Sequence, residues 1–465
     1  MRRLFFILIT IFVTTISFAQ TENYKTAMEN FQANYNDDKY DEIFNSFSSE
    51  MKQGLPLADT KQFLSNLKTQ VGKIESKEFI KIEEGTYATY KTKFEKAIFA
   101  VHISIDSQNK INGLFIKPYE ESNNGGNNTF YALRSYPKEI AEIIYSKSKD
   151  FPNNAQLSIA IIQNGKTNYY GIIKENDSIK PSENQHKVFE IGSITKVFTS
   201  TVLASLVEEK KIKLTDYVNS YYSFPFKDNI KISFESLANH TSGLPRLPQN
   251  LDLSNEINPY KNYKAKELEE YLKNLLKLEN EPLKTYSYSN LGAGLLGYTL
   301  GLSQKTSFNA LLQKKIFDKY KMMDSFTSSQ NLGNKLVKGL SANGELVSNW
   351  DFDVLFGGGG ILSTTADLAK FANAQFNPEN KELSLTRKPT FVIKDKMKIG
   401  LGWHILKLEK DKELFWHNGG TGGYSSSMAV NVEEKTAIII LSNVSGINEK
   451  IDVICFDLLN KISKK

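Results

Sequence analysis

Apolar and polar residues follow different patterns on the two sides of a polar segment at residues 119–130. Before it, apolar residues first recur at helical spacing and then alternate with the two-residue period of strands. The helical stretches are 24–31, 40–47 and 60–69, and the strand-like stretches are 79–82, 88–94, 97–105 and 111–116. Helices followed by an antiparallel meander predict a small α+β domain over residues 21–118. The glycine- and asparagine-rich segment 119–130 is predicted to be a linker.

The pattern over residues 131–465 predicts a second α+β domain. Residues 158–163 and 168–173 are predicted to form a hairpin around Asn164-Gly165, a strong two-residue turn signal. Residues 210–340 are predicted to be mainly helical with loops, and the chain ends in strands and one helix, at 400–408, 414–417, 424–431, 436–442 and 450–462. An antiparallel sheet built from both ends of the domain, flanked by helices and interrupted by a helical insertion, predicts a ligand cleft.

A long apolar run in the second domain begins at a serine and a lysine. Ser193 and Lys196 are three residues apart, which on a helix places their Cβ atoms about 5–6 Å from each other. The apolar residues around them cover most of the helix circumference and predict a buried central helix: Ile194, Val197, Phe198, Val202, Leu203, Leu206 and Val207. Burial lowers the pKa of a lysine toward the neutral amine that a base requires. The pair is therefore a candidate nucleophile and base.

The same Ser-x-x-Lys spacing occurs elsewhere, where it predicts only solvated surface pairs. These pairs begin at Ser49, Ser65, Ser107, Ser135 and Ser146. Only the pair at Ser193 opens a buried helix, whose first-turn N–H groups offer partial positive charge to an oxyanion.

Three further patches carry polar residues that apolar packing does not require. Tyr288 and Asn290 stand at the entrance of a helix, where a hydroxyl and an amide could relay a proton and hold a carbonyl; the alternative is a simple helix cap at Ser289 or Asn290. Residues 240–245 form a turn-rich loop. Residues 416–424 contain glycines that let a backbone N–H approach a reacting carbonyl, or else form a flexible hairpin turn.

Together these patches resemble the penicillin-recognising serine hydrolases related to class C β-lactamases, D-alanyl-D-alanine carboxypeptidases and some esterases. The resemblance covers residues 131–465. It rests on residues 189–196 (FEIGSITK), 237–245 (LANHTSGLP), 288–290 (YSN), 357–364 with four consecutive glycines, and 417–420 (HNGG). It implies a β-lactamase/transpeptidase-like fold for this domain. Residues 21–118 likewise resemble a small cone-shaped accessory domain of unknown function.

The resemblance also implies roles for individual residues. Ser193 would be the nucleophile, Lys196 its activating partner and Tyr288 the second acid/base. Asn290 would orient the substrate, and the N–H groups of Ser193 and Gly420 would form the oxyanion hole.

The chain departs from the family where β-lactamases have Lys-Thr-Gly on the inner strand. Here the residues are His417, Asn418 and Gly419. A lysine offers permanent positive charge to a substrate carboxylate, whereas histidine is mostly uncharged at neutral pH. His417, Gly419 and Gly420 stay candidate substrate-binding residues, but affinity for penicillins is not expected.

Composition narrows the classes of function. The net charge of +6 includes two leader arginines, and only Arg134, Arg246 and Arg387 follow them, which argues against nucleic-acid binding. The five histidines show no metal-ligand spacing, and no phosphate-loop or dinucleotide signature is present, so neither a metal nor a cofactor is predicted. The lone Cys455 is predicted to be a buried filler.

The first nineteen residues predict a bacterial signal peptide. Arg2-Arg3, an apolar stretch from Leu4 and the sequence Ser17-Phe18-Ala19 give its three regions, with cleavage after Ala19. The alternative is an uncleaved anchor, but the apolar run is shorter than the ~20 residues that span a bilayer. We expect an exported, periplasmic or secreted protein with no transmembrane segment in its mature chain.

The sequence therefore predicts an exported serine hydrolase that cleaves a small-molecule ester, amide or peptide through an acyl-enzyme on Ser193, with either Lys196 or Tyr288 as the base. Two alternatives remain. A cell-wall D-Ala-D-Ala carboxypeptidase or a β-lactamase would use the same residues, and a non-catalytic binding or sensor protein could keep the scaffold. The presence of a nucleophile, a base and an oxyanion donor together favours catalysis. No feature indicates an oligomeric state.

Overall fold

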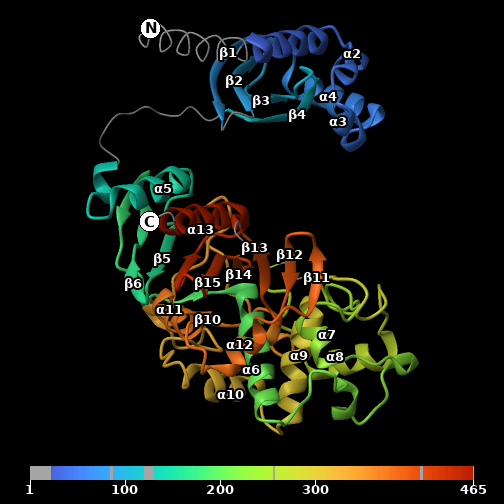
Figure 1. Ribbon diagram of the computed structural model, residues 1–465, viewed down its shortest axis with the longest axis vertical. Coiled ribbons are helices and arrows are strands. Elements are labelled where there is room, and N and C mark those ends of the chain that lie inside the picture. Colours follow the sequence, from blue (N-terminus) through green and yellow to red (C-terminus); the bar gives the residue numbers. More distant parts are fainter. Residues whose placement is uncertain (1–21, 84–86, 120–129, 255–256, 409–411, 464–465) are drawn as a thin grey trace, which may run out of the picture. The chain divides into compact units, whose positions relative to one another are not determined.

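The computed structural model describes residues 22–463 apart from 84–86, 120–129, 255–256 and 409–411 (Figure 1). The chain divides into two compact units, Met1–Gly126 and Asn127–Lys465. The predicted leader, residues 1–19, and nearly all of the predicted linker lie outside the described residues, so those limits stay predictions. Within the described residues, no helix combines the length and the apolar character needed to cross a membrane.

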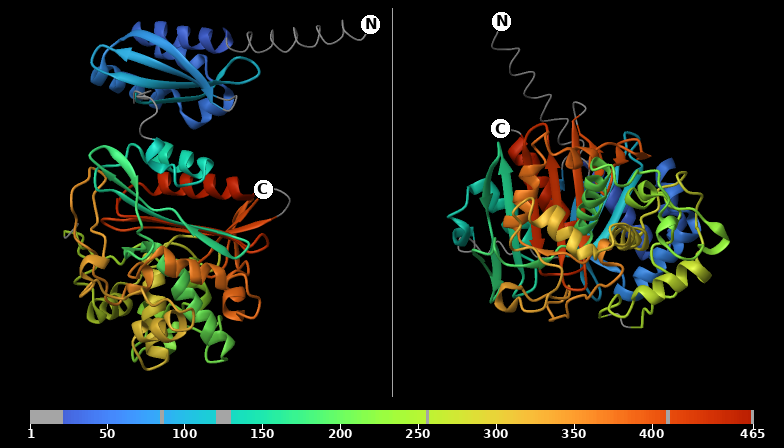
Figure 2. Two further views of the ribbon diagram at one scale, coloured as in Figure 1. Left: turned by 90° about the vertical axis from the view of Figure 1, so that its left-hand side faces the viewer. Right: turned by 90° about the horizontal axis from the view of Figure 1, so that it is seen from below.

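The N-terminal unit packs helices on one face of a four-stranded antiparallel sheet (Figure 2). Residues 22–36 are helical and are followed by α2 (Tyr40–Asn45), α3 (Ser49–Gly54) and α4 (Leu57–Val71). The sheet is a meander of β1 (Ile74–Glu83), β2 (Tyr87–Phe94), β3 (Ile98–Ile105) and β4 (Ile111–Pro118). Tyr35 and Phe31 from the first helix pack with Phe94 of the sheet in a buried core. The predicted α+β order is confirmed, and the first strand begins earlier than predicted, at Ile74, opposite Phe94.

A ten-stranded antiparallel sheet forms the middle of the C-terminal unit. Its early strands are β5 (Gln156–Gln163), β6 (Lys166–Tyr169), β7 (Ile172–Glu175) and β8 (Ser178–Pro181). Its late strands are β11 (Phe391–Lys394), β12 (Met397–Ile399), β13 (His404–Lys407), β14 (Glu413–Gly420), β15 (Ser425–Asn431) and β16 (Thr436–Ser442). The order is β11-β12-β13-β14-β15-β16-β5-β7-β8, with β6 paired to β5. The two ends of the domain meet where β16 pairs with β5, as predicted.

The predicted hairpin at the start of this sheet is confirmed. Gln163 pairs with Lys166, and Asn164 and Gly165 between them have φ of 51° and 76°. Both central residues of the favoured two-residue hairpin turn need positive φ, which asparagine and glycine tolerate best. The returning strand is split into β6 and β7.

Helices cover both faces of the sheet (Figure 2). On one face, α5 (Lys138–Ser148) and α13 (Asn448–Ser463) share a core with the strands, in which Ile144, Ile454 and Ile438 are buried. On the other face lie α6 (Thr195–Glu208), α11 (Thr365–Ala374) and the helices of the insertion and of the segment that follows it: α7 (Phe234–Ala238), α8 (Ala265–Glu270), α9 (Asn290–Ser303), α10 (Phe308–Leu312) and α12 (Lys381–Thr386). A small sheet pairs β9 (Phe189–Glu190) with β10 (Leu362–Ser363).

Residues 210–340 contain more loop than the pattern predicted. Apart from α9, the α-helices in this region are five or six residues long, although α8 and α10 each continue into a π-helical segment, Tyr271–Leu275 and Gln313–Phe317; turns and loops connect the helices. Ser233, Ser289 and Ser307 each cap a helix by accepting a hydrogen bond from a backbone N–H. Frequent caps and turns end helices that apolar spacing alone would extend.

The helix α6 is buried along nearly its whole length, as predicted. Every residue from Thr195 to Leu206 is buried, between the sheet and the other helices. The helix itself begins at Thr195, so Ser193 lies on a preceding 3₁₀ turn, Gly192–Ile194, rather than in its first α-helical turn. Gly192 has a φ of 53°, which turns the chain from β9 into the helix.

Candidate active site

Ser193 and Lys196 are in direct contact at the N-terminal end of α6. Lys196 Nζ lies 2.9 Å from Ser193 Oγ and donates a hydrogen bond of 2.6 Å to the main-chain oxygen of Gly358. Lys196 is only 2% exposed. Burial, and secondarily the charge of Arg246, lower the pKa of Lys196 well below its ordinary value. A neutral amine at this distance can accept the proton of the serine hydroxyl.

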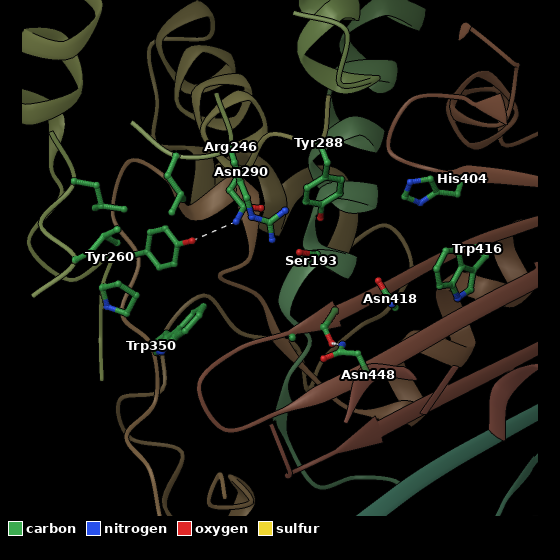
Figure 3. A pocket seen from close by; sticks show the side chains of 16 residues that line it. Ser193, Arg246, Tyr260, Tyr288, Asn290, Trp350, His404, Trp416, Asn418 and Asn448 are labelled. Carbon is green, nitrogen blue, oxygen red and sulfur yellow. Dashed lines mark hydrogen bonds between the residues drawn. The ribbon is translucent and has the colours of Figure 1, made fainter. Parts of the chain in front are cut away.

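Tyr288 completes the cluster on the other side of the serine (Figure 3). Its hydroxyl points toward Ser193, and Lys196 Nζ lies 4.8 Å from the centre of its ring. Burial raises the pKa of Tyr288 above its ordinary value, while the Ser193 side chain acts in the opposite direction. Tyr288 thus holds its proton at neutral pH, and its hydroxyl faces the serine that Lys196 contacts.

Ser289 caps α9, whereas the side-chain amide predicted to orient the substrate belongs to the next residue, Asn290. Ser289 Oγ accepts from Gly292 N at 2.8 Å and donates to Pro245 O at 2.6 Å. Asn290 is therefore not needed as the cap, and it lines the pocket. Its Nδ2 donates to Tyr260 Oη at 3.3 Å, and its buried Oδ1 has no partner among the described residues. That oxygen can accept an N–H or O–H from a ligand.

Backbone from two elements meets beside Ser193. A Cβ atom at Gly192 would lie 2.6 Å from Gly420 N, and one at Gly419 would lie 2.8 Å from Ser193 N. The end of β14 therefore packs against the turn before α6 with no space for side chains. The N–H groups of Ser193 and Gly420 belong to these two facing segments, which is the arrangement an oxyanion hole requires.

Gly419 and Gly420 belong to a strand and not to a hairpin turn. They are the last residues of β14 and pair with Ser426 and Ser425 of β15. The predicted strand ended at His417. Glycines have no side chain, so they do not extend the alternation of apolar and polar residues by which a strand is recognised. The turn itself consists of residues 421–424.

His417 is 1% exposed and lies beneath the pocket, rather than among the residues that line it. Its ring centre is 6.2 Å from that of Tyr288 and 5.2 Å from that of His404, and its Nδ1 donates to Asn418 O at 2.6 Å. Burial, then the neighbouring His404 and Lys196, hold the pKa of His417 well below its ordinary value. The ring is neutral and offers no positive charge, as expected for this departure from Lys-Thr-Gly.

The pocket over Ser193 has a volume of about 650 Å³ and includes residues that the sequence did not single out (Figure 3). They come from several loops and strands: Arg246, Leu247, Leu251, Leu253, Pro259, Tyr260, Trp350, His404 and Asn448. Trp416 and Asn418, from the patch at residues 416–424, also line the pocket. No periodic pattern marks such loop residues. Within the described residues, no cluster of His, Cys, Asp and Glu has the geometry of a metal site.

The loop at residues 240–245 supports the tyrosine from behind. The ring of His240 lies 4.4 Å from that of Tyr288, centre to centre, and its Nδ1 accepts from Ser289 N at 3.2 Å. His240 has a φ of 59°, which aims its ring at this position.

The buried carboxyl group of Glu190 supports the wall of the pocket that Trp350 lines. Glu190 Oε1 accepts from Asn349 Nδ2 at 2.7 Å and from Trp350 N at 2.9 Å. Trp350 in turn packs edge-on against Tyr260. Burial raises the pKa of Glu190. Glu190, three residues before Ser193, thus connects the nucleophile's turn to the pocket wall.

The buried histidines predict acid sensitivity. Burial is the largest cause of the lowered pKa values of His240, His404 and His417, and that of His404 falls to about 4. Unfolded histidine has a pKa of about 6.5, so below that pH the unfolded chain binds more protons and the folded unit loses stability. We expect the Tm to fall as the pH decreases from about 6.5 toward 4, and the slope to be smaller in His404→Gln. The exposed His186 gives the control: His186→Gln should keep the wild-type slope, and equal slopes in all three proteins would contradict this account.

Comparison with known proteins agrees with this geometry. The family model described as Beta-lactamase matches residues 151–452, and the model described as a protein of unknown function (DUF3887) matches residues 28–114. A protein named Beta-lactamase from Pseudomonas fluorescens is 27% identical over 54% of this chain and 69% of its own length. Protein flp from Staphylococcus aureus (strain MRSA252) is 25% identical over 62% of this chain. The alignment spans only 59% of the length of that second relative.

Proposed function

This chain belongs to the beta-lactamase family, and we propose that it is a serine hydrolase that cleaves an ester or amide through an acyl-enzyme on Ser193. The observation that carries the proposal is the 2.9 Å contact of Ser193 Oγ with the buried Lys196 amine, beside the Tyr288 hydroxyl. A nucleophile hydrogen-bonded to a group able to take its proton is the signature of covalent catalysis.

The proposed reaction has two halves. Ser193 Oγ attacks the carbonyl carbon while its proton passes to the neutral amine of Lys196, and the N–H groups of Ser193 and Gly420 stabilise the tetrahedral oxyanion. The proton then moves to the leaving alkoxide or amine as its bond to carbon breaks. A water molecule then attacks the acyl-serine and gives a proton to the same base. The base passes this proton to Ser193 Oγ as the bond between the acyl carbon and that oxygen breaks, which releases the acid and restores the serine. Because the pKa of Lys196 is lowered, its neutral form is available for the first step.

A fluorophosphonate probe tests the nucleophile directly. We expect the intact mass to increase by one phosphonyl group, and no increase in Ser193→Ala. Ser146 begins another Ser-x-x-Lys pair but is exposed and bonds to Ile143 O, so Ser146→Ala should be labelled like the wild type. Labelling that persists in Ser193→Ala would contradict the proposal.

A β-lactamase or cell-wall carboxypeptidase activity is the second candidate, favoured by the name of the Pseudomonas fluorescens relative. The neutral His417 speaks against it, because it leaves no charge at the position of the Lys-Thr-Gly lysine, where the carboxylate of a penicillin or a peptide C-terminus would be expected. A fluorescent penicillin distinguishes the two: we expect fast ester turnover with little or no labelling of Ser193, and rapid labelling would favour the second candidate.

We also propose that the protein is exported, on the strength of the leader-like residues 1–19. The mature protein would then act on a small molecule in the periplasm or outside the cell. In cells expressing the full chain, the N-terminal residue of the protein in the soluble periplasmic or secreted fraction should be Gln20. A cytoplasmic product retaining Met1 or Arg2 would contradict this.

A further inference from the structure

The pocket over Ser193 contains one permanently charged side chain. Among the described residues that line it, Arg246 is the only Lys, Arg, Asp or Glu. His404 also lines the pocket, but its pKa is lowered to about 4, so it is uncharged at neutral pH. The pocket therefore has a positive charge that none of the described lining residues balances.

Arg246 is held in place by its main chain and presents its side chain to the solvent. Its carbonyl oxygen accepts hydrogen bonds from Asn290 N at 3.0 Å and Leu291 N at 3.1 Å, which fixes it against the start of α9. The guanidinium carbon lies 5.3 Å from the centre of the Tyr288 ring. The side chain is exposed, and no ion pair to it is found among the described residues. The main chain of Arg246 is thus held in place, and the N–H groups of its guanidinium are available to a ligand.

The pocket side chains on the other side of Ser193 from Arg246 carry no charge. Figure 3 shows Arg246, Asn290 and Tyr260 on one side of the serine and Asn418, Asn448 and Trp416 on the other. Asn418 donates its Nδ2 to Asp452 Oδ2 at 2.6 Å, and Asn448 donates its Nδ2 to Gly419 O at 2.6 Å. These side chains offer neutral amides. An anion is therefore favoured on one side of the nucleophile only.

We propose that Arg246 binds a carboxylate carried by the substrate, so that this enzyme prefers anionic esters or amides to neutral ones. The inference rests on the proposed function of Ser193 and names the substrate class of that site. A guanidinium matches a carboxylate with two parallel N–H donors, which makes arginine the preferred partner of this group. The carboxylate lies in the half of the substrate that extends along Asn290 and Tyr260.

Nitrophenyl esters in matched pairs test the preference. The first pair is para-nitrophenyl butyrate and mono-para-nitrophenyl succinate, with the carboxylate in the acyl half. The second is para-nitrophenyl acetate and acetoxynitrobenzoate, with the carboxylate in the leaving group. A charged hydrogen bond contributes about 1.5–3 kcal/mol, so we expect kcat/KM to be roughly tenfold or more higher for the anionic member of one pair. The pair that shows the advantage identifies the half of the substrate that Arg246 contacts.

Variants assign the preference to Arg246. The anionic-to-neutral ratio of kcat/KM should fall to about one in Arg246→Gln and be partly kept in Arg246→Lys, which retains charge but not the planar fork. Arg134 is an exposed arginine of the same unit that does not line the pocket, so Arg134→Gln controls for net charge and should keep the ratio. A ratio near one in the wild type, or an unchanged ratio in Arg246→Gln, would overturn the proposal.

The charge of Arg246 also helps to lower the pKa of Lys196. The anionic-to-neutral ratio of kcat/KM distinguishes this effect on the catalytic lysine from binding of the substrate carboxylate. If Arg246 only tuned the catalytic groups, Arg246→Gln would slow both esters of a pair by the same factor, which would overturn the proposal. If no ester is hydrolysed, the proposed function fails while the binding inference is still measurable. Calorimetry of Ser193→Ala with glutarate monoanilide should then show binding that is lost in Ser193→Ala/Arg246→Gln, and absence of binding in the first variant would overturn it.

Discussion

Replacing Ser193 with alanine is expected to reduce kcat for a chromogenic ester by roughly 10⁴-fold or more, because members of a nucleophile–base unit act together and removal of one eliminates covalent catalysis. The fold should survive. The Ser193 side chain is half-buried and is hydrogen-bonded to Lys196, so the expected change in the free energy of unfolding is about 1 kcal/mol. Steady-state kinetics and a thermal melt measure the two effects.

Non-additivity provides the control for this expectation. Lys196→Met should also lose most of the activity, and Ser193→Ala/Lys196→Met should be little slower than either single variant, because both remove the same step. Lys196→Met also removes a buried amine, so its melt should be recorded beside its rate. If a folded Ser193→Ala kept most of its activity, the mechanism would be wrong.

The second large effect is expected at Gly192. In Gly192→Ala, the new Cβ would lie 2.6 Å from Gly420 N, at a φ of 53° that L side chains rarely adopt. The end of β14 must move, and with it the N–H group that faces the nucleophile. Loss of one oxyanion-hole donor costs about 10²–10³-fold in kcat, and we expect a loss of this size in kcat/KM for the neutral ester.

Gly165→Ala is the control that separates the effect of this close contact from the effect of backbone strain. Gly165 also has a positive φ, 76°, but a Cβ there would meet nothing within 4 Å. Gly165→Ala should therefore lose about 1 kcal/mol of stability through strain at positive φ, with little change in activity. Equal kinetic losses in Gly165→Ala and Gly192→Ala would show that strain alone, and not the displaced strand, explains the effect.

Local patterns were sufficient for much of the fold. The run of apolar residues after Ser193 predicted the buried helix α6, because a helix that is apolar all round has no stable exposed face. Asn164-Gly165 predicted its hairpin because the turn geometry requires positive φ at both positions. The strand β16 was predicted at its observed ends, since its apolar run at 437–441 is uninterrupted, and β15, which begins with three serines, was predicted one residue too early at its start.

Other elements depended on partners far away in the chain. β14 continues three residues beyond His417, because Asn418, Gly419 and Gly420 pair with β15. The short strands β11 and β12 have mixed apolar and polar residues, and they belong to the sheet only because β12 pairs with β13 and β11 pairs with β12. The insertion was predicted to be more helical than it is, because side-chain caps and loops compete with helix propensity.

The sequence by itself determined the chemical groups of the candidate site, since Ser193, Lys196, Tyr288, Asn290 and Gly420 each stand at a recognisable helix start or glycine pair. The tertiary structure decided how these groups act. Burial of Lys196 and His417 depends on side chains from several elements, and pKa values follow that burial. The charge that Arg246 brings to the pocket was likewise invisible in the sequence, because loop residues have no periodicity and meet Ser193 only when the chain is folded.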